Sequence, residues 1–507
     1  MKTAFLASLT FAVLSTAGAD WRDEAGLPQL QAELGAAMPT GAGIPLMMSE
    51  ASTVLADPPS VPAIYLPQGT AGTTPFSGTG NLAGKTIIPH SGASEASGHA
   101  SGVANLFCGT QSMSQGVTNL HAWWADDFAA QVYFSNPIPT FTGSIQNHSW
   151  VGGDEDDNVN LEFIRRFDFM VNRDAVVALT PLNNGPDMAK FLANAYHGIT
   201  AGRMDGGHPQ THSNLDTSGR MKPDIVVNAS FTSTASPCVG SVAALLLDAI
   251  RPAFPDADDP RVVKSIILSG ASKDNLLGWK RANMSRPYDE VYGAGLLHVL
   301  NAYHILAAGR QTASEGASHG LRGWDRGTSS TSTPRHYFFT LLPNQWGATV
   351  SATITWHRDI SSDYSVSTLA NLNLHLRHAS GFTIGAVVDE SISSIDNVEH
   401  LFLRNLPPGD YVLEVSASSN SITYGLSWEV QAGTGPQLNV TRDGSQVTLL
   451  LSQLDPLKTY TIEHSGNLTS WHTLTTLRTA DTTPATTATQ QDSVSTGPKF
   501  YRLAWTP

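Results

Sequence analysis

A serine at the start of an apolar helix is the first feature with chemical meaning. The stretch NASFTSTASPCVGSVAALLL, residues 228–247, places small hydroxyl residues, Ser233 among them, before a helix with almost no polar face. Such a helix is expected to be buried on all sides, with its first turn among unpaired backbone N–H groups. Ser233 could simply cap the helix. It could also be a nucleophile, provided that a base, an orienting acid and an oxyanion donor lie nearby.

Three other segments offer those groups, and each has a simpler interpretation. GHASGVANLFCG places His99 at the start of a helix of small residues, where it could be an ordinary exposed or satisfied histidine. GIPLMMSEAS is an apolar strand ending at Glu50, which is either a solvated strand end or an acid at the carboxyl edge where α/β sites form. AVVALTPLNNG leads into Asn183, whose amide either belongs to a turn or donates to an oxyanion.

The elements that would position these residues alternate between strand and helix. From about residue 40 to 310, apolar strand-like runs alternate with helical patterns, which predicts an α/β fold with a mostly parallel sheet flanked by helices. Residues 311–334 are rich in Gly, Ser and Thr and are predicted to form a linker. Period-two patterns in 335–432 and 433–507 predict two all-β domains, the first a β-sandwich.

Taken together, these segments resemble the subtilisin-like serine peptidases, the subtilases. Five segments match motifs of the family, in the family's order. GHASGVAN corresponds to the HGTHVAG motif, NHSWVG to the substrate-lining strand and PLNNG to the oxyanion turn. KPDI is identical to the family's KPDI segment, and FTSTASP corresponds to the GTSxAxP motif. The resemblance covers about 260 of the 507 residues, within a peptidase domain expected over 20–310. It implies protein or peptide substrates and no required metal or organic cofactor. The catalytic residues that the resemblance implies are Glu50, His99, Ser233 and Asn183. The substrate-binding residues that it implies are Ser149, Trp150 and Gly152.

The sequence departs from the family at several of these positions. The family acid is usually Asp, but Glu50 occupies the matching place; a Glu can still accept from a histidine N–H, and Asp57 is the alternative acid. Phe231 replaces the Gly before the family's Thr-Ser pair, while His148 and Trp150 alter the substrate strand. We expect these changes to affect pocket shape and efficiency more than the reaction class.

Two rival functions use the same residues. A catalytically inactive homologue could bind peptides or surfaces through its β domains, a hypothesis favoured by Phe231 and the missing Asp. A non-peptidase hydrolase could use the same triad. The β-sandwich over 335–432 resembles one appended to many secreted bacterial subtilases, and 433–507 resembles a small fibronectin-like module; binding or spacing is their expected role.

Composition and the N-terminal residues indicate an exported, acidic protein. The formal charge of −14 disfavours nucleic acid or an anionic membrane as a partner. Residues 1–19, MKTAFLASLTFAVLSTAGA, are typical of a secretory signal peptide, and no later run is expected to span a bilayer. We therefore expect a secreted monomer. Its two cysteines, Cys108 and Cys238, are either one disulfide or, more simply, buried free thiols.

Two short segments remain. The acidic run GDEDDN, residues 153–158, precedes a helix; it fits a helix start, a calcium site, or a preference for basic substrate residues. The interval between the signal peptide and Gly43 is long enough for one helix with Leu27, Leu30 and Leu34 on a single face. We predict that this helix packs on the catalytic domain, because it is too short to bury a core of its own.

Overall fold

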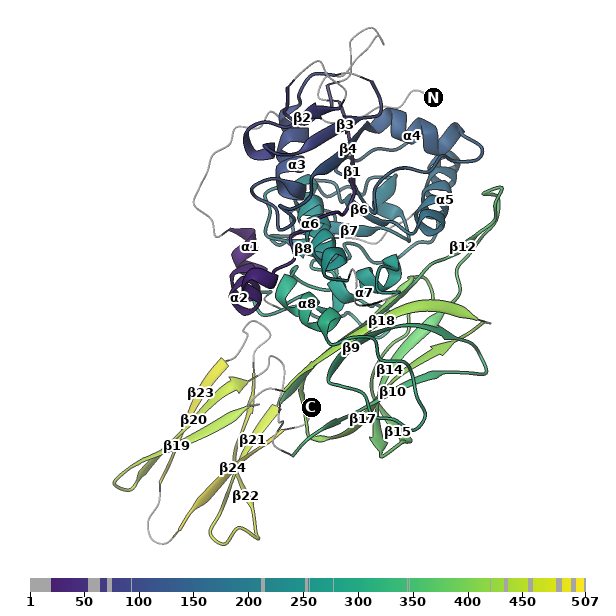
Figure 1. Cartoon of the computed structure of the whole chain (residues 1–507). Helices are drawn as coiled ribbons and strands as arrows, with labels where there is room; N and C mark the ends of the chain where they lie inside the picture. Colours follow the sequence, from purple (N-terminus) through teal and green to yellow (C-terminus); the bar gives the residue numbers. More distant parts are fainter. Residues whose placement is uncertain are drawn as a thin grey trace.

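The protein consists of an α/β part, a β-sandwich below it and a small β module at the far end (Figure 1). The structure is a computed structural model, and it describes residues 20–505 except 53–63, 71–74, 93, 211–214, 251–253, 255, 277, 344, 346, 420, 433–435, 455–458, 480–485 and 494–497. The expected signal peptide and the alternative acid Asp57 both lie outside the described residues.

An eight-stranded sheet forms the centre of the α/β part. Its strand order is β2-β3-β4-β1-β5-β6-β7-β8, and all neighbours are parallel except β2 and β3. The strands are β1 Leu46–Glu50, β2 Phe76–Ser77, β3 Thr86–Pro89, β4 Asn119–Trp124, β5 Ile145–His148, β6 Val177–Pro181, β7 Ile199–Arg203 and β8 Ile225–Val227. Because the strands are parallel, their carboxyl ends share one edge, and Glu50 lies on it.

Helices cover both faces of this sheet, as the alternating pattern predicted. Leu46 and Met48 of β1 pack in the same core as helices α3 Gly98–Cys108 and α6 Thr232–Ile250. Met47 points to the opposite face, into a second core with α4 Ala125–Phe134 and α5 Asp157–Asp174. Helices α7 Pro260–Ser269 and α8 Val299–Ala307 complete the first layer.

Helix α6 is the centre of that first layer. It is the one helix within the described ranges whose length and apolarity would suit a membrane span, but 83% of its most apolar window is buried inside the protein, as in a core helix. Gly240 lets α3 approach closely, since a Cβ there would lie 2.7 Å from the ring of Phe107. The small residues of α6 therefore bring the α3 and α6 helices together.

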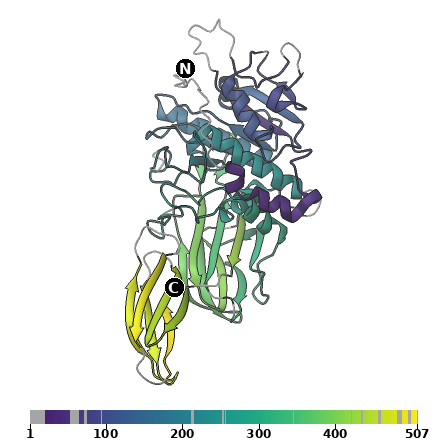
Figure 2. The same ribbon diagram turned by 90° about the vertical axis from the view of Figure 1, so that its left-hand side faces the viewer.

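The N-terminal helices pack on the α/β part, which confirms the prediction for this segment. Helices α1 Trp21–Glu24 and α2 Leu27–Leu34 lie against the flank of this part (Figure 2). Leu27 and Leu30 are buried there, and Glu33 pairs with His304 of α8 at 2.8 Å.

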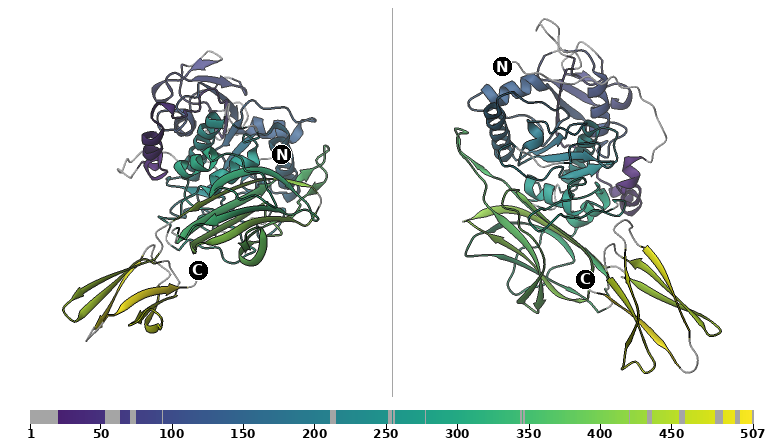
Figure 3. Two further views of the ribbon diagram at one scale, coloured as in Figure 1. Left: turned by 60° about the horizontal axis from the view of Figure 1, so that its bottom comes forward. Right: turned by 180° about the vertical axis from the view of Figure 1, so that it is seen from behind.

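The β-sandwich consists of two four-stranded sheets, ordered β10-β17-β14-β15 and β16-β11-β18-β9 (Figure 3). Large aromatic side chains such as Trp356 and Trp428 fill the core between them. A hairpin of β12 and β13 extends beside α5 (Figure 1). The strands are β9 Arg322–Ser329, β10 Arg335–Leu341, β11 Ala348–Trp356, β12 Asp359–Ile360, β13 Ser367–Thr368, β14 Leu372–Ser380, β15 Thr383–Ser391, β16 Val398–Leu406, β17 Gly409–Ala417 and β18 Ile422–Gln431.

The predicted linker over 311–334 is wrong in its second half, because β9 lies inside it. This strand pairs with β18 along its whole length, and its Trp324 is fully buried with the indole N–H donating to Leu306 O at 3.1 Å. The glycines of β9 leave room for side chains of the sandwich, since a Cβ at Gly323 would lie 2.9 Å from the Trp428 ring and one at Gly327 would lie 2.4 Å from Tyr424. The sandwich therefore begins within the segment predicted to separate it.

The last module consists of two three-stranded sheets with a small core around Leu449, Leu451, Tyr460 and Ile462. Its strands are β19 Gln437–Asp443, β20 Gln446–Leu454, β21 Thr459–Ser465, β22 His472–Arg478, β23 Thr486–Ser493 and β24 Phe500–Trp505. The chain thus has the predicted fold class, a mostly parallel α/β sheet flanked by helices and followed by two all-β parts.

Candidate active site

Glu50 and His99 form a hydrogen-bonded pair at the carboxyl edge of the sheet. Glu50 is the last residue of β1, and His99 is in the first turn of α3, whose N-cap Ser97 accepts from the Ala100 N–H at 3.2 Å. His99 Nδ1 donates to Glu50 Oε2 at 2.7 Å. A carboxylate can only accept, so the pair holds the proton of His99 on Nδ1.

Burial and charge act against each other in this pair. Glu50 is 1% exposed, and burial raises its pKa in spite of the neighbouring imidazole. Burial also disfavours a charged His99, but the charge and the hydrogen bond of Glu50 outweigh it and raise the pKa of His99 above its usual value. The pair therefore favours an imidazole that readily takes a second proton.

Ser233 is the second residue of α6, and only 8% of it is exposed. Its carbonyl oxygen accepts a hydrogen bond from Ser149 Oγ at 2.8 Å. Ser149 in turn accepts from the side-chain amide of Asn147 at 2.8 Å, and Asn147 Oδ1 accepts from Ser236 Oγ at 2.7 Å. These buried contacts fix the start of α6 against the end of β5.

The two asparagines of the predicted oxyanion turn make different contacts. The Asn183 amide donates to Asp187 O at 3.1 Å, within its own loop. Asn184 instead reaches the helix start, where its Oδ1 accepts from the Thr232 N–H at 2.8 Å and from Thr232 Oγ1 at 3.1 Å. Asn184 Nδ2 has no hydrogen-bond partner within the described part of the chain. Asn184 is thus the asparagine of this turn whose side chain contacts Thr232, the residue before Ser233.

The three predicted substrate-binding residues occupy different environments. Ser149 lies against Ser233, as described above. Trp150 is 4% exposed and packs in the core beside α5, where its indole N–H donates to Ser49 Oγ at 2.7 Å. Its side chain therefore anchors residues 149–152 to this core. The Gly152 carbonyl accepts from the N–H groups of Lys190 and Phe191 at 3.1 and 2.9 Å. Residues 149–152 are therefore held between the start of α6 and the β6–β7 loop.

Sequence reasoning placed Asn147 and His148 in the substrate strand but did not predict that they and Gln146 are buried polar residues that support the site. Gln146, Asn147 and His148 are all fully buried in β5. His148 Nδ1 bonds to Ser49 Oγ at 2.7 Å, and burial lowers the pKa of His148 to about 3, so that it is neutral. Three consecutive polar residues in a central parallel strand are unusual. That pattern was the available signal for a functional neighbourhood.

The acidic run serves the start of α5. Asp156 caps the helix by accepting from the Asn158 N–H at 2.9 Å, and Asp157 pairs with Lys190 at 2.8 Å. Within the described residues, no group of three or more His, Cys, Asp or Glu side chains is arranged to hold a metal ion. Both cysteines, Cys108 and Cys238, are free and buried.

Comparison with known proteins finds structural likeness only. No family model and no curated protein matches the sequence. Among solved structures, tripeptidyl peptidase 2 matches over 80% of this chain at 9% identity and a TM-score of 0.30; this chain spans 51%, about half, of its length. MycP1 from the ESX-1 type VII secretion system matches over 59% of this chain and 89% of its own at 15% identity and a TM-score of 0.33. A lanthipeptide protease matches over 57% and 93%, at 13% identity and a TM-score of 0.35. At such scores these likenesses carry no assignment, which must come from the site itself.

Proposed function

We propose that this chain is a secreted serine endopeptidase of the subtilisin type, which hydrolyses peptide bonds through Ser233, His99 and Glu50. The observation that carries the proposal is the 2.7 Å hydrogen bond between His99 and the buried Glu50. Ser233, at the start of α6, bonds through its carbonyl to Ser149, which follows β5, the strand beside β1. An acid, a base and a hydroxyl in this chain order are the parts of a hydrolytic triad.

The proposed reaction assigns one task to each residue. Ser233 Oγ attacks the peptide carbonyl carbon while His99 Nε2 removes the hydroxyl proton. The tetrahedral intermediate then expels the amine, which takes that proton from His99, and water hydrolyses the acyl-enzyme by the same route. Glu50 holds the Nδ1 proton and stabilises the imidazolium that forms. None of these steps requires a metal or an organic cofactor.

Two donors are proposed for the oxyanion. The backbone N–H of Ser233 lies in the first turn of α6, where helix N–H groups have no intrahelical partner. The Asn184 Nδ2 is the second donor, because Thr232 holds the opposite end of that amide. Substrates would be peptides or proteins outside the cell, given the secretory signal expected in residues 1–19.

Labelling with a fluorophosphonate probe tests the proposal. The wild-type protein is expected to label, and Ser233→Ala should lose both labelling and peptide hydrolysis while remaining folded. Ser241→Ala is the matched control, since Ser241 is buried in the same helix and donates only to Cys238 O at 2.9 Å. A folded wild-type protein that neither labels nor cleaves would support the inactive, peptide-binding homologue instead.

A further inference from the structure

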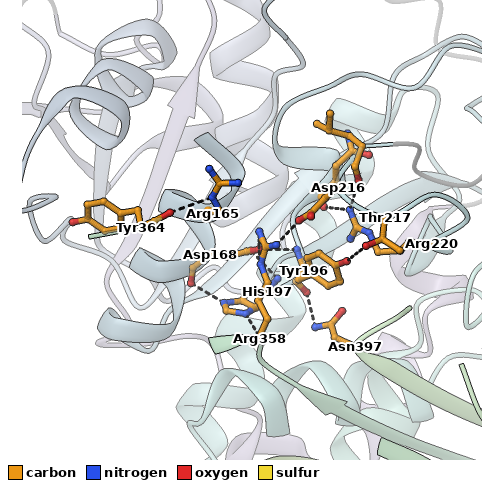
Figure 4. A network of polar contacts seen from close by, with 12 residues as sticks. Arg165, Asp168, Tyr196, His197, Asp216, Thr217, Arg220, Arg358, Tyr364 and Asn397 are labelled. Carbon is orange, nitrogen blue, oxygen red and sulfur yellow. Dashed lines mark hydrogen bonds and ion pairs between the residues drawn. The ribbon is translucent and has the colours of Figure 1, made fainter. Parts of the chain in front are cut away.

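The β-sandwich reaches the loop between β6 and β7 through a buried arginine. Arg358 follows β11, and its side chain is 2% exposed at the boundary with the α/β part (Figure 4). Its guanidinium bonds to Asp168 of α5 at 2.9 Å and also to Asp216, while its backbone N–H donates to His197 Nε2 at 2.9 Å. One residue of the sandwich thus contacts three segments of the α/β part.

Asp168 connects Arg358 to the end of the loop. Its carboxylate accepts from the backbone N–H groups of Tyr196 and His197 at 3.2 and 2.9 Å. His197 Nδ1 lies 2.7 Å from Asp168 O; since a carbonyl only accepts and a backbone N–H only donates, His197 carries its proton on Nδ1 and is neutral. Burial is the main cause that lowers the pKa of His197 to about 4, in agreement with that state.

The same loop is anchored a second time by the sandwich. Asn397, which precedes β16, donates through Nδ2 to Tyr196 O at 2.8 Å and to Trp356 O at 2.7 Å. Asp168, which is paired with Arg358, therefore accepts the N–H groups of this short backbone segment, while Asn397 donates to its C=O. Both contacts are buried, so water does not compete for them.

From this anchor the chain leads two residues back to Asn194, whose side chain connects it to the substrate-binding region. Asn194 donates to Ala189 O at 2.6 Å, and the next two residues, Lys190 and Phe191, donate to Gly152 O. Gly152 belongs to the segment whose Ser149 bonds to Ser233 O. We call residues 149–152 and 189–191 the substrate wall. The contacts that lead from Arg358 to this wall do not include Glu50, His99 or Ser233, although Ser149 of the wall itself bonds to Ser233 O.

We propose that Arg358 is a positioning residue for the substrate wall, so that the β-sandwich is part of the substrate-binding apparatus. The proposal rests on the proposed peptidase function, because it concerns how that site holds an extended peptide. A loosened wall weakens the binding of a peptide, whereas a small probe that needs only the nucleophile and its base reacts as before.

The test is Arg358→Lys in the full chain, which keeps the charge near Asp168 but loses the two-sided contact. We expect KM for a peptide substrate to rise about tenfold, with kcat and the fluorophosphonate labelling rate within about threefold of wild type. Amide hydrogen exchange should become faster at Lys190 and Phe191. Arg326→Lys is the matched control, since Arg326 of β9 pairs with Asp259 at 2.7 Å across the same boundary but contacts no part of the loop.

The second variant is Asn397→Ala, which removes the other anchor without changing a charge and decides the matter if Arg358→Lys does not fold. An unchanged KM and unchanged exchange in a folded variant would overturn the proposal. So would an equal rise of KM in Arg326→Lys, since the effect would then be general loosening. If the wild-type protein does not label at all, the peptidase function fails, and the exchange measurement alone reports on the anchor.

Discussion

Glu50 and Asp168 are both buried carboxylates beside a basic partner, but their hydrogen bonding differs. Glu50 bonds to His99 through one oxygen, and its Oε1 has no partner in the described part of the protein. Both oxygens of Asp168 accept hydrogen bonds, from two backbone N–H groups and from Arg358. The basic partners differ too, since the His99 side chain is 22% exposed and that of Arg358 is 2% exposed.

This difference sets the pKa values of the two acids in opposite directions. Burial raises the pKa of Glu50 because one imidazole does not offset the loss of solvation. Burial acts in the same sense on Asp168, but the charge of Arg358 and the backbone N–H groups of His197 and Tyr196 outweigh it and lower the pKa. A fully paired carboxylate is fixed in its charged form, whereas a sparsely paired one remains responsive to its partner. The first suits a structural anchor, and the second suits an acid that stabilises a neighbouring histidine when that histidine takes up a proton.

The largest expected effect is on turnover and comes from Glu50. Glu50→Gln should lower kcat about 10⁴-fold, because an amide neither stabilises the imidazolium nor enforces the histidine tautomer. Steady-state hydrolysis of a peptide measures this. The free energy of unfolding should fall little, since the variant removes a buried charge. An active Glu50→Gln enzyme would contradict the triad, and a large loss in Asp57→Asn would move the acid to that residue.

Asp168 should show the converse behaviour, a loss of stability. Asp168→Ala leaves Arg358 buried without its main partner and should cost about 3–5 kcal/mol of unfolding free energy. Urea unfolding measures the loss. Asp157→Ala, in the same helix, is the control, because its pair with Lys190 is exposed and screened by solvent, so that its loss should hardly change the unfolding free energy. Similar losses of unfolding free energy in the two variants would show that Asp168 is not a structural anchor.

The oxyanion turn predicts a smaller effect on turnover. Asn184→Ala should lower kcat about 10²–10³-fold, while Asn183→Ala should change it little, because only the former amide reaches the start of α6. Asn184→Asp keeps an acceptor for the Thr232 N–H but has no N–H to donate, so its kcat should be as low as that of the alanine variant. The reverse ranking of the two asparagines would restore Asn183 as the donor.

The smallest expected effect is a shift in pH dependence. The reaction needs neutral His99, so kcat/KM should rise as pH increases through the pKa of His99. Since Glu50 raises that pKa, the limb should lie above the ordinary histidine value of about 6.5. In Glu50→Gln only burial remains, which lowers the pKa, and the residual activity should begin at lower pH. A pH–rate profile that is identical in the two proteins would show that Glu50 does not set the pKa of His99.

The Glu50–His99 pair followed from local pattern. Glu50 closes an apolar strand and His99 opens a helix of small residues, and in a parallel sheet the strand ends and the helix starts that follow them lie at one edge. Which asparagine of the turn contacts α6 did not follow, because two neighbouring amides have the same local sequence context. Only the position of Thr232, 48 residues away, brings the Asn184 side chain to the start of α6.

The sequence by itself determined the fold class and the elements that carry Glu50, His99 and Ser233, because strand and helix periods and the residues at their ends are local properties. It did not predict β9, because the Gly and Ser content of this segment is typical of a linker. The contact of Trp324 with Leu306 of α8, which the sequence does not show, fixes the strand in place. Only the tertiary structure decided how Asp168, His197 and Arg358 pair, since they come from segments far apart in the chain. A charged side chain is buried only where its hydrogen-bonding partners surround it. Arg358 and Asp168 are 190 residues apart in the sequence, so no local sequence pattern predicts that they pair.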